Sequence, residues 1–329
     1  MSKIAQRLIA VAITPLILFL LAFVWAYIVS PPGAGAKYAE AMGIPHKAVV
    51  AHRGASFYAP EETRPAYLLA RDMQPDYIEM DLQRTKDGVL IAFHDHTVAR
   101  TTNAAQVFPG RENDSVGDFT WDELQQLDAG SWFNEARPEF ARESYTRGVK
   151  IIRLTEFLEI AGSGDHQPGV YIETKSAKKF PGIEKQLVDT LKETGWIGGS
   201  RPPAAVILQS FEKESLAKLK ELAPNTPRVY LIHPRMEEAE GWKPLLERAR
   251  ELGHGIGPVG FLGWPWYTGV AHDMGLVVHP YTLNKPWQMR LLSHFGADGF
   301  FTDRADLGLQ LYGRGQDIDI DAILKSHGY

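Results

Sequence analysis

The sequence predicts an α/β protein: a closed (β/α)8 barrel of the TIM type, preceded by one N-terminal transmembrane helix. Between residues 48 and 312, short apolar runs rich in β-branched residues alternate with stretches of helical spacing. This alternation is typical of a parallel sheet covered by helices. The region also has the length of one such barrel, which is typically about 250 residues. An open doubly wound sheet is the alternative, but no glycine-rich phosphate loop follows the first apolar run.

Each element of the barrel is expected from the local pattern of apolar residues. Strands are expected where a continuous apolar run is short, at residues 48–52, 77–82, 89–94, 170–174, 205–209, 228–232, 276–279 and 299–302. Helices are expected where apolar residues recur with helical spacing, at residues 65–73, 183–194, 212–222, 244–252 and 286–295. Together these segments predict one barrel domain at residues 48–312.

Three segments fall outside this alternation. Residues 104–150 are rich in Asp, Arg, Gly and aromatic residues and predict an inserted loop region, with one short helix near residues 121–127. Residues 31–47 predict a linker, and residues 313–329 predict a C-terminal helix or tail. None of these segments has the pattern of a second domain.

The N-terminal segment has the pattern of a membrane anchor. Residues 8–30 carry no charge and follow the basic residues Lys3 and Arg7. As a helix they would extend about 34 Å, enough to cross a hydrocarbon core of about 30 Å. Trp25 and Tyr27 stand near the far end, where aromatic rings prefer the membrane interface.

Two fates are open for this segment. We expect residues 1–30 to stay as an anchor, with the barrel domain on the non-cytoplasmic (periplasmic) side, because basic residues precede the apolar run. The alternative is a cleaved signal peptide, which would leave a secreted or periplasmic protein. Such peptides have apolar cores of about 7–15 residues, although the small residues at 33–36 could accept a peptidase.

Composition excludes several classes of site. The chain has no cysteine, which excludes disulfides, thiolate zinc sites and cysteine nucleophiles. Its 35 basic and 40 acidic residues give a net charge of −5, so nothing predicts a nucleic acid partner.

Candidate catalytic side chains stand at the ends of the expected strands. His52 and Arg53 end the first strand, and His94 ends the third. Glu79 and Asp81 lie two residues apart on the second strand, so both carboxylates face the same side. In a barrel of parallel strands these ends meet at one mouth, where active sites are found. Two imidazoles that transfer protons beside a carboxylate cluster suit metal-assisted cleavage of a phosphate ester.

A further carboxylate and a basic side chain also stand at the end of an expected strand. Glu173 and Lys175 lie two residues apart at the end of the fourth strand, and the fork of Arg53 fits phosphate oxygens. Buried carboxylates are unfavourable unless they are paired or bind a cation. Oxygen ligands of this kind favour Mg²⁺ or Ca²⁺ over zinc. We therefore expect one divalent cation, Mg²⁺ or Ca²⁺, on three carboxylates: Glu79, Asp81 and Glu173.

A set of short motifs carries a resemblance to a known family. The motifs are His52-Arg53-Gly54, Pro60-Glu61-x-Thr63, Glu79-x-Asp81, Thr85-Lys86-Asp87-Gly88, His94-Asp95, and residues 128–133, 173–175, 209–211, 279–282 and 298–303. Together they resemble the glycerophosphodiester phosphodiesterase family over about residues 48–306, and its periplasmic branch most. The resemblance implies a TIM-type barrel that hydrolyses glycerophosphodiesters to sn-glycerol 3-phosphate and an alcohol.

The resemblance also implies roles for single residues. His52 would accept a proton and His94 would donate one. Arg53 and Lys175 would contact the phosphate, with Glu61 in support. The divalent cation would lie on the three carboxylates named above. The substrate's own glycerol hydroxyl would then serve as nucleophile, so no serine or cysteine nucleophile is needed.

The chain departs from the family pattern at two places. Glu62 stands where relatives usually carry Asn or His, and it either tunes metal affinity or faces solvent. Residues 151–154 replace a proline-containing turn, which affects the expected loop geometry but not the chemistry.

Alternatives to the main hypothesis remain open at the level of the sequence. Trp264 and Trp266 either pack against the barrel rim or form an apolar lip for a lipid tail or a bilayer, which would favour lysophospholipid substrates. A phospholipase D-like or phosphoinositide-cleaving barrel would use similar residues, and a catalytically idle binding protein is the third alternative. The remaining histidines are interpreted as structural or surface residues: His233, His254, His272, His279 and His294.

Overall fold

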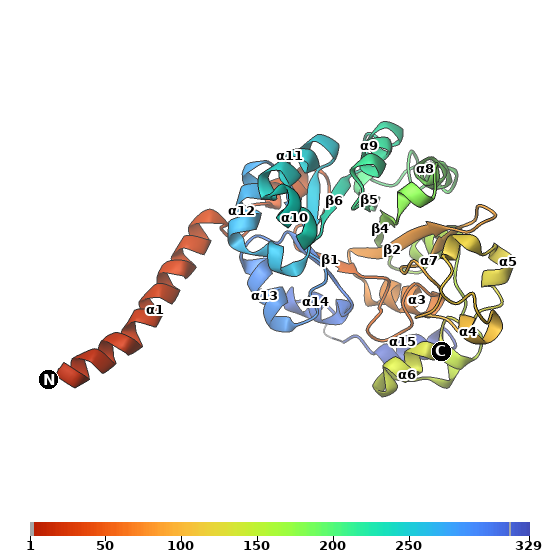
Figure 1. Cartoon of the computed structure of the whole chain (residues 1–329), viewed down its shortest axis with the longest axis horizontal. Helices are drawn as coiled ribbons and strands as arrows, with labels where there is room; N and C mark the ends of the chain where they lie inside the picture. The colour runs from red at the N-terminus through yellow and green to blue at the C-terminus, as the bar shows by residue number, and fades with distance from the viewer. Residues whose placement is uncertain (1–2, 316) are drawn as a thin grey trace.

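The molecule is a barrel of parallel strands surrounded by helices (Figure 1). This computed structural model describes residues 3–315 and 317–329, with the backbone alone for residues 3–13 and 16. The barrel strands are β1 (Ala48–Ala51), β2 (Tyr77–Arg84), β4 (Gly169–Thr174), β5 (Val206–Ser210), β6 (Arg228–Ile232), β7 (Gly255–Pro258), β8 (Val277–Val278) and β9 (Gly299–Thr302). They pair in the order β8-β7-β6-β5-β4-β2-β1-β9, each parallel to its neighbour.

Backbone hydrogen bonds close the seam between the two end strands. The amide of Asp298 donates to the carbonyl of Val278 (2.9 Å), and the amide of Phe301 donates to that of Pro280 (3.0 Å). The amide of Leu283 donates to the carbonyl of Phe301 (2.8 Å). The predicted barrel is therefore confirmed, and the open doubly wound alternative is wrong.

Helices cover the outside of the barrel, and shorter helices form the insertion. The surrounding helices are α3 (Arg64–Met73), α7 (Leu154–Ala161), α8 (Ile183–Glu193), α9 (Lys213–Leu222), α10 (Pro234–Glu240), α11 (Trp242–Leu252), α12 (Pro265–Asp273), α13 (Pro286–His294) and α14 (Ala305–Leu311). The insertion contains α4 (Ala104–Val107), η1 (Val116–Asp118), α5 (Trp121–Leu124), α6 (Ser131–Ala136), η2 (Pro138–Phe140) and η3 (Glu143–Thr146). The remaining elements are α1 (Lys3–Val29), α2 (Ala36–Ala41), η4 (Ala177–Lys179), η5 (Pro203–Ala205), η6 (Gly260–Gly263) and α15 (Ile320–Ser326).

Alternation along the strands builds two hydrophobic cores. In β2, Tyr77 faces the inside of the barrel, where it packs with Tyr171 and Phe301. The next residue, Ile78, belongs to the larger core beneath the helices, as does Ile172 of β4. Because side chains alternate with a period of two, the inward positions that follow Tyr77 and Tyr171 carry the carboxylates Glu79, Asp81 and Glu173. The aromatic core thus forms the floor of a polar mouth.

Two sequence predictions for strands need correction. The run at residues 89–94 contains β3 (Leu90–Ala92), which is not a barrel strand: it pairs antiparallel with β2 in a hairpin that turns at residues 85–88. The prediction was wrong because periodicity does not distinguish a buried hairpin strand from a parallel one. Conversely, β7 was missed because its residues, Gly-Ile-Gly-Pro, include one β-branched side chain and two glycines.

The expected N-terminal helix is present as α1. It projects away from the barrel, and its C-terminal end lies beside α12 (Figure 1). Side chains 8–13 and 16 of the predicted membrane span lie outside the described residues. Among the residues that are described, none of the helices combines the length and the apolar character that crossing a membrane requires.

The turn after β1 depends on a glycine and yields a test of the fold. Gly54 has φ +81°, and a Cβ there would lie 2.7 Å from the backbone of Ala66. Gly88 has φ +90° but open space around it. We expect Gly88→Ala to lower the free energy of unfolding by about 1–2 kcal/mol through strain alone. Gly54→Ala should lose about 1–3 kcal/mol more through the clash. Urea unfolding of the two variants measures the difference, and equal losses would contradict this packing.

Candidate active site

The predicted site residues gather in one pocket at the carboxyl ends of the strands. The pocket is lined by seven of the eight predicted side chains: His52, Arg53, Glu79, Asp81, His94, Glu173 and Lys175. The eighth, Glu61, lies behind Arg53 and accepts a hydrogen bond from its Nη1 (2.9 Å). The wall is completed by Gln209, Phe211, Leu231, Tyr281 and Phe301. Strands β1, β2 and β4 thus bring together residues that lie more than a hundred positions apart in the sequence.

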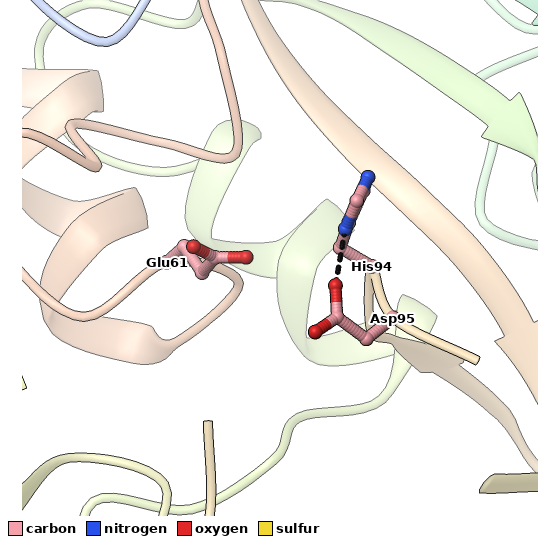
Figure 2. Close-up of side chains that lie close together, drawn as sticks. All are labelled: Glu61, His94 and Asp95. Carbon is pink, nitrogen blue, oxygen red and sulfur yellow. Dashed lines mark hydrogen bonds and ion pairs between the residues drawn. The ribbon is translucent and has the colours of Figure 1, made fainter. Parts of the chain in front are cut away.

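Each pocket histidine forms a hydrogen bond with a carboxylate. His52 Nδ1 lies 2.7 Å from Asp303 Oδ1, and His94 Nδ1 lies 2.6 Å from Asp95 Oδ1. Figure 2 shows the second of these pairs. Since an ionised carboxylate can only accept, each Nδ1 carries the proton. Both imidazoles are therefore oriented with Nε2 available for proton transfer.

Asp303 is held firmly at the end of β9. Asn284 Nδ2 donates to its Oδ2 (2.6 Å), and Ser56 Oγ donates to its Oδ1 (3.1 Å). Burial opposes ionisation, but the hydrogen bond with His52 and the other nearby donors hold the pKa of Asp303 at about 2. The carboxylate therefore stays charged near neutral pH and fixes the ring of His52.

Three carboxylates are buried together in the mouth of the barrel. Glu79 and Asp81 are each 1% exposed and Glu173 is 6% exposed. Asp81 of β2 and Glu173 of β4 are directly opposite in the strand register. Burial and then the charge of Asp81 raise the pKa of Glu79 well above its usual value. Burial, opposed by Lys175 and reinforced by Asp81, raises the pKa of Glu173 to about 8. Additional positive charge would stabilise the ionised cluster.

The donor atoms fit a divalent cation. Among the described residues, the buried atoms Asp81 Oδ2 and Gln209 Oε1 have no hydrogen-bond donor. Carboxylate oxygens of Glu62, Glu79 and Asp81 lie within 4.8 Å of one another. Oxygen-rich clusters of this kind suit Mg²⁺ or Ca²⁺. This group contains Glu62 in place of the predicted ligand Glu173. It is able to hold a divalent cation, and its composition does not distinguish between these two metals.

Glu62 belongs to this buried cluster and does not face solvent. It is 4% exposed, and its Oε1 accepts a hydrogen bond from the amide of Asp81 (3.1 Å). Its Oε2 accepts a short hydrogen bond from the hydroxyl of Tyr67. Burial, with the charge of Asp81, raises the pKa of Glu62 well above its usual value. Of the two sequence alternatives for Glu62, the solvent-facing one is wrong.

Two cations balance part of this negative charge. Lys175 Nζ lies 3.0 Å from Asp81 Oδ1 and 3.3 Å from Glu173 Oε2. The backbone amide of Arg53 donates to Glu79 Oε2 (2.8 Å), and its guanidinium Nε lies 3.2 Å from Asp81 Oδ2. Burial opposes the charge on Asp81, but Lys175 above all holds its pKa far below the usual value.

Arg100 is a site residue that the sequence did not reveal. Its guanidinium bonds Asp95 (Nε to Oδ2, 2.6 Å) and Glu61 (Nη2 to Oε1, 2.6 Å). Glu61, His94 and Asp95 lie close enough together to resemble a second metal site (Figure 2). Because Arg100 already binds both carboxylates, we interpret the group as an ion-pair network that connects His94 with Arg53.

The residues that position the two histidines are not evident from the sequence. Asp95 and Asp303 stand inside motifs that carry the resemblance, but nothing in their spacing shows that each bonds a histidine. Arg100 follows the hairpin in a segment without periodicity, so only the folded chain shows its two partners.

The aromatic pair Trp264 and Trp266 lies outside the pocket lining. The two rings stack with centroids 5.3 Å apart, and Trp266 also stacks on Trp25 of α1, with centroids 6.0 Å apart. The residues therefore pack at the junction of α1 with the barrel, and they do not form a lip of the catalytic pocket.

Comparison with known proteins agrees with this site. The sequence profile of the glycerophosphoryl diester phosphodiesterase family matches residues 52–307. A glycerophosphodiester phosphodiesterase of Bacillus subtilis (strain 168) is 39% identical over 282 residues, which cover 86% of this chain and 92% of the relative. Another from Caldanaerobacter subterraneus is 33% identical, covering 81% of this chain and 98% of that protein.

Solved structures share the fold. A putative glycerophosphoryl diester phosphodiesterase from Silicibacter pomeroyi superposes with a TM-score of 0.67 at 24% identity, covering 81% of this chain and 93% of that one. A phosphodiesterase from Oleispira antarctica, solved in complex with the product sn-glycerol-3-phosphate, has a TM-score of 0.65 at 23% identity, covering 81% and 96%. The family profile and the 39% identical relative show that the chain belongs to the glycerophosphoryl diester phosphodiesterase family. The protein is therefore an enzyme, a phosphoric diester hydrolase.

Proposed function

We propose that the enzyme hydrolyses glycerophosphodiesters to sn-glycerol 3-phosphate and an alcohol, with His52 and His94 as the proton-transferring groups. The observation that carries this proposal is the pair of histidines, each oriented by a carboxylate, that line one pocket with buried carboxylates and two cations. The Oleispira antarctica relative, which binds sn-glycerol-3-phosphate as a product, supports the same product here.

The first half of the reaction uses a hydroxyl of the substrate. His52 Nε2 accepts the proton of the glycerol hydroxyl, whose oxygen attacks phosphorus. The bond from phosphorus to the departing alcohol breaks, and His94 Nε2 protonates that alcohol. Burial, together with Lys175 and Arg53 and against Asp81 and Asp95, lowers the pKa of His94. An imidazolium with a lowered pKa is a stronger proton donor, which fits this role.

The second half opens the cyclic phosphate with water. His94, now neutral, accepts a proton from the water as its oxygen attacks phosphorus. His52, now protonated, donates its proton to the glycerol oxygen that leaves, which returns both rings to their first states. Lys175 and Arg53 bind phosphate oxygens and stabilise the charge that develops on them.

A divalent cation, Mg²⁺ or Ca²⁺, would bind Glu79, Asp81 and Glu173, where it would neutralise charge on the phosphate oxygens. The buried Oδ2 of Asp81, which accepts no hydrogen bond, supports this assignment. Glu62 reaches the same cluster and would contribute negative charge next to the ion. Glu61 supports the phosphate contact indirectly, because it holds Arg53 together with Arg100.

Two other reactions can be distinguished from glycerophosphodiester hydrolysis by the products that they release. A lysophospholipid would need room for an acyl chain, and the residues Trp264 and Trp266 do not line the pocket. A phosphoinositide-cleaving or phospholipase D-like reaction would release a different headgroup or leave no sn-glycerol 3-phosphate. Glycerophosphodiesters therefore remain the substrate class that the pocket supports best.

The proton transfers yield the main test. His52→Ala and His94→Ala should each lower kcat on glycerophosphocholine by about 10²–10⁴-fold, because each removes one proton transfer from each half of the reaction. The release of sn-glycerol 3-phosphate and choline measures this in the presence of Mg²⁺ or Ca²⁺. His233→Ala, which changes an exposed histidine outside the pocket, is the control. Wild-type activity in either pocket variant would refute the assignment.

Asp303 yields a second test. Asp303→Asn keeps the shape of the side chain but removes the charge that accepts the Nδ1–H of His52, so the ring is free to take the wrong tautomer. We expect kcat to fall by about 10²-fold or more, with KM changed much less. Steady-state kinetics and unfolding of the same preparation separate this from misfolding. A raised KM with unchanged kcat would show that Asp303 serves binding instead.

A further inference from the structure

The exposed hydrophobic surface of the protein is concentrated on one side. Among the described side chains, large exposed hydrophobic residues occur only on α1, η6, α12 and α13. On the barrel they are Phe261, Trp266, Val270 and Trp287, between 39% and 56% exposed. On α1 they include Leu18, Phe19 and Ile28, each at least 60% exposed. An apolar patch of this kind marks a contact surface, and tryptophan prefers the membrane interface.

The end of α1 is fixed to the same surface. Ser30 Oγ lies 2.9 Å from Thr268 Oγ1 and donates to the carbonyl of Phe295 (3.1 Å). A Cβ at Gly269 would lie 2.1 Å from the carbonyl oxygen of Val29, so α12 approaches this end as closely as only glycine permits. Figure 1 shows the end of α1 beside α12, and Trp25 of α1 stacks on Trp266 of α12, so the exposed apolar side chains of the two helices adjoin.

A cationic pocket opens beside this junction. It has a volume of about 510 Å³, and its walls include His46, Lys47, Arg290 and His294. Among the described residues no carboxylate forms an ion pair with Lys47 or Arg290. Buried Asp298 lies 3.7 Å from the wall residue His46, and it also contacts His272.

Helix α13 connects the pocket with the apolar surface. Trp287, Arg290 and His294 stand three and four residues apart, so they lie on one face of the helix, and all three are exposed. A tryptophan beside a cation that has no carboxylate partner suits a surface where hydrocarbon meets anionic headgroups.

We propose that this pocket binds the phosphate of an anionic phospholipid while Trp266 and Trp287 enter the adjoining lipid interface. The phosphate supplies the counter-charge that Lys47 and Arg290 lack. A free phosphate would satisfy those cations but would leave the aromatic surface uncovered, so the membrane lipid is the favoured source. This site is separate from the catalytic pocket: Lys47 precedes β1, whereas His52 follows it at the opposite end of the strand.

The arrangement has a consequence for the enzyme. Lipid bound at the amino end of β1 leaves the catalytic mouth at the carboxyl end of the barrel, away from the bound headgroup. Lipid binding here goes beyond the proposed function. Its absence would not affect the proposed hydrolysis at the catalytic pocket, and a lack of hydrolysis would not affect lipid binding.

Native mass spectrometry of the full chain in non-ionic detergent tests the proposal. Dioleoylphosphatidylglycerol, dioleoylphosphatidylcholine and inorganic phosphate are added in separate titrations. We expect phosphatidylglycerol to bind more tightly than the other two. Lys47→Ala/Arg290→Ala should weaken that binding about 25-fold, since each basic residue near an anionic lipid contributes roughly fivefold. The double variant Arg235→Ala/Lys243→Ala, which removes two exposed cations elsewhere, is the matched control.

Further variants keep the test decisive. Arg290→Glu changes an exposed side chain, so it replaces the double variant if that protein does not fold. Trp287→Ala should weaken lipid binding but not phosphate binding. Hydrolysis of glycerophosphocholine should be unchanged in all of them. Equal lipid binding by wild type and the pocket variants would overturn the proposal. Phosphate binding as tight as lipid binding, with no effect of Trp287→Ala, would assign the pocket to a free anion and also overturn it.

Discussion

The burial of four carboxyl groups in the mouth of the barrel is the constraint on which the site depends. Glu62, Glu79, Asp81 and Glu173 are each less than 7% exposed, and mutual repulsion adds to the unfavourable desolvation. Lys175 and Arg53 offset part of this charge. The remaining negative charge is the reason for our proposal that the mouth holds a divalent cation together with an anionic phosphate. Without compensating charge, the same strands would favour protonated carboxyl groups.

The catalytic groups are arranged around that cluster by elements outside the barrel. The β2–β3 hairpin carries His94 and Asp95 over the mouth, and Arg100 fastens this segment to Glu61. On the other side, the turn after β9 carries Asp303 to His52. If both histidines transfer protons as we propose, they depend on the positions of Asp95 and Asp303, two carboxylates outside the lining of the pocket. Ion pairs and hydrogen bonds through Glu61, Arg100 and Asp95 also fix the position of Arg53 relative to His94.

The sequence predicted the barrel and the eight site residues because both follow from local patterns and from motifs. Continuous apolar strands and carboxylates at period-two spacing are visible without a structure, as with Glu79 and Asp81. What the sequence could not predict depends on pairing between distant segments. The hairpin β3 and the glycine-rich β7 lacked a distinguishing period, and the partners of Asp303 and Arg100 exist only in the fold. The membrane orientation of the N-terminal helix, and the choice between Mg²⁺ and Ca²⁺, stay predictions.

Isothermal titration of the metal-free enzyme with Mg²⁺ and with Ca²⁺ measures whether the carboxylate cluster binds a divalent cation, as we propose. Glu79→Gln is the informative variant, because burial and Asp81 already disfavour the charge on Glu79, so the metal-free variant should fold as well as wild type. A metal site at this cluster predicts one binding event in the wild type and a loss of affinity of about tenfold or more in the variant. No binding of either ion to the wild type, or equal affinity in both proteins, would contradict it.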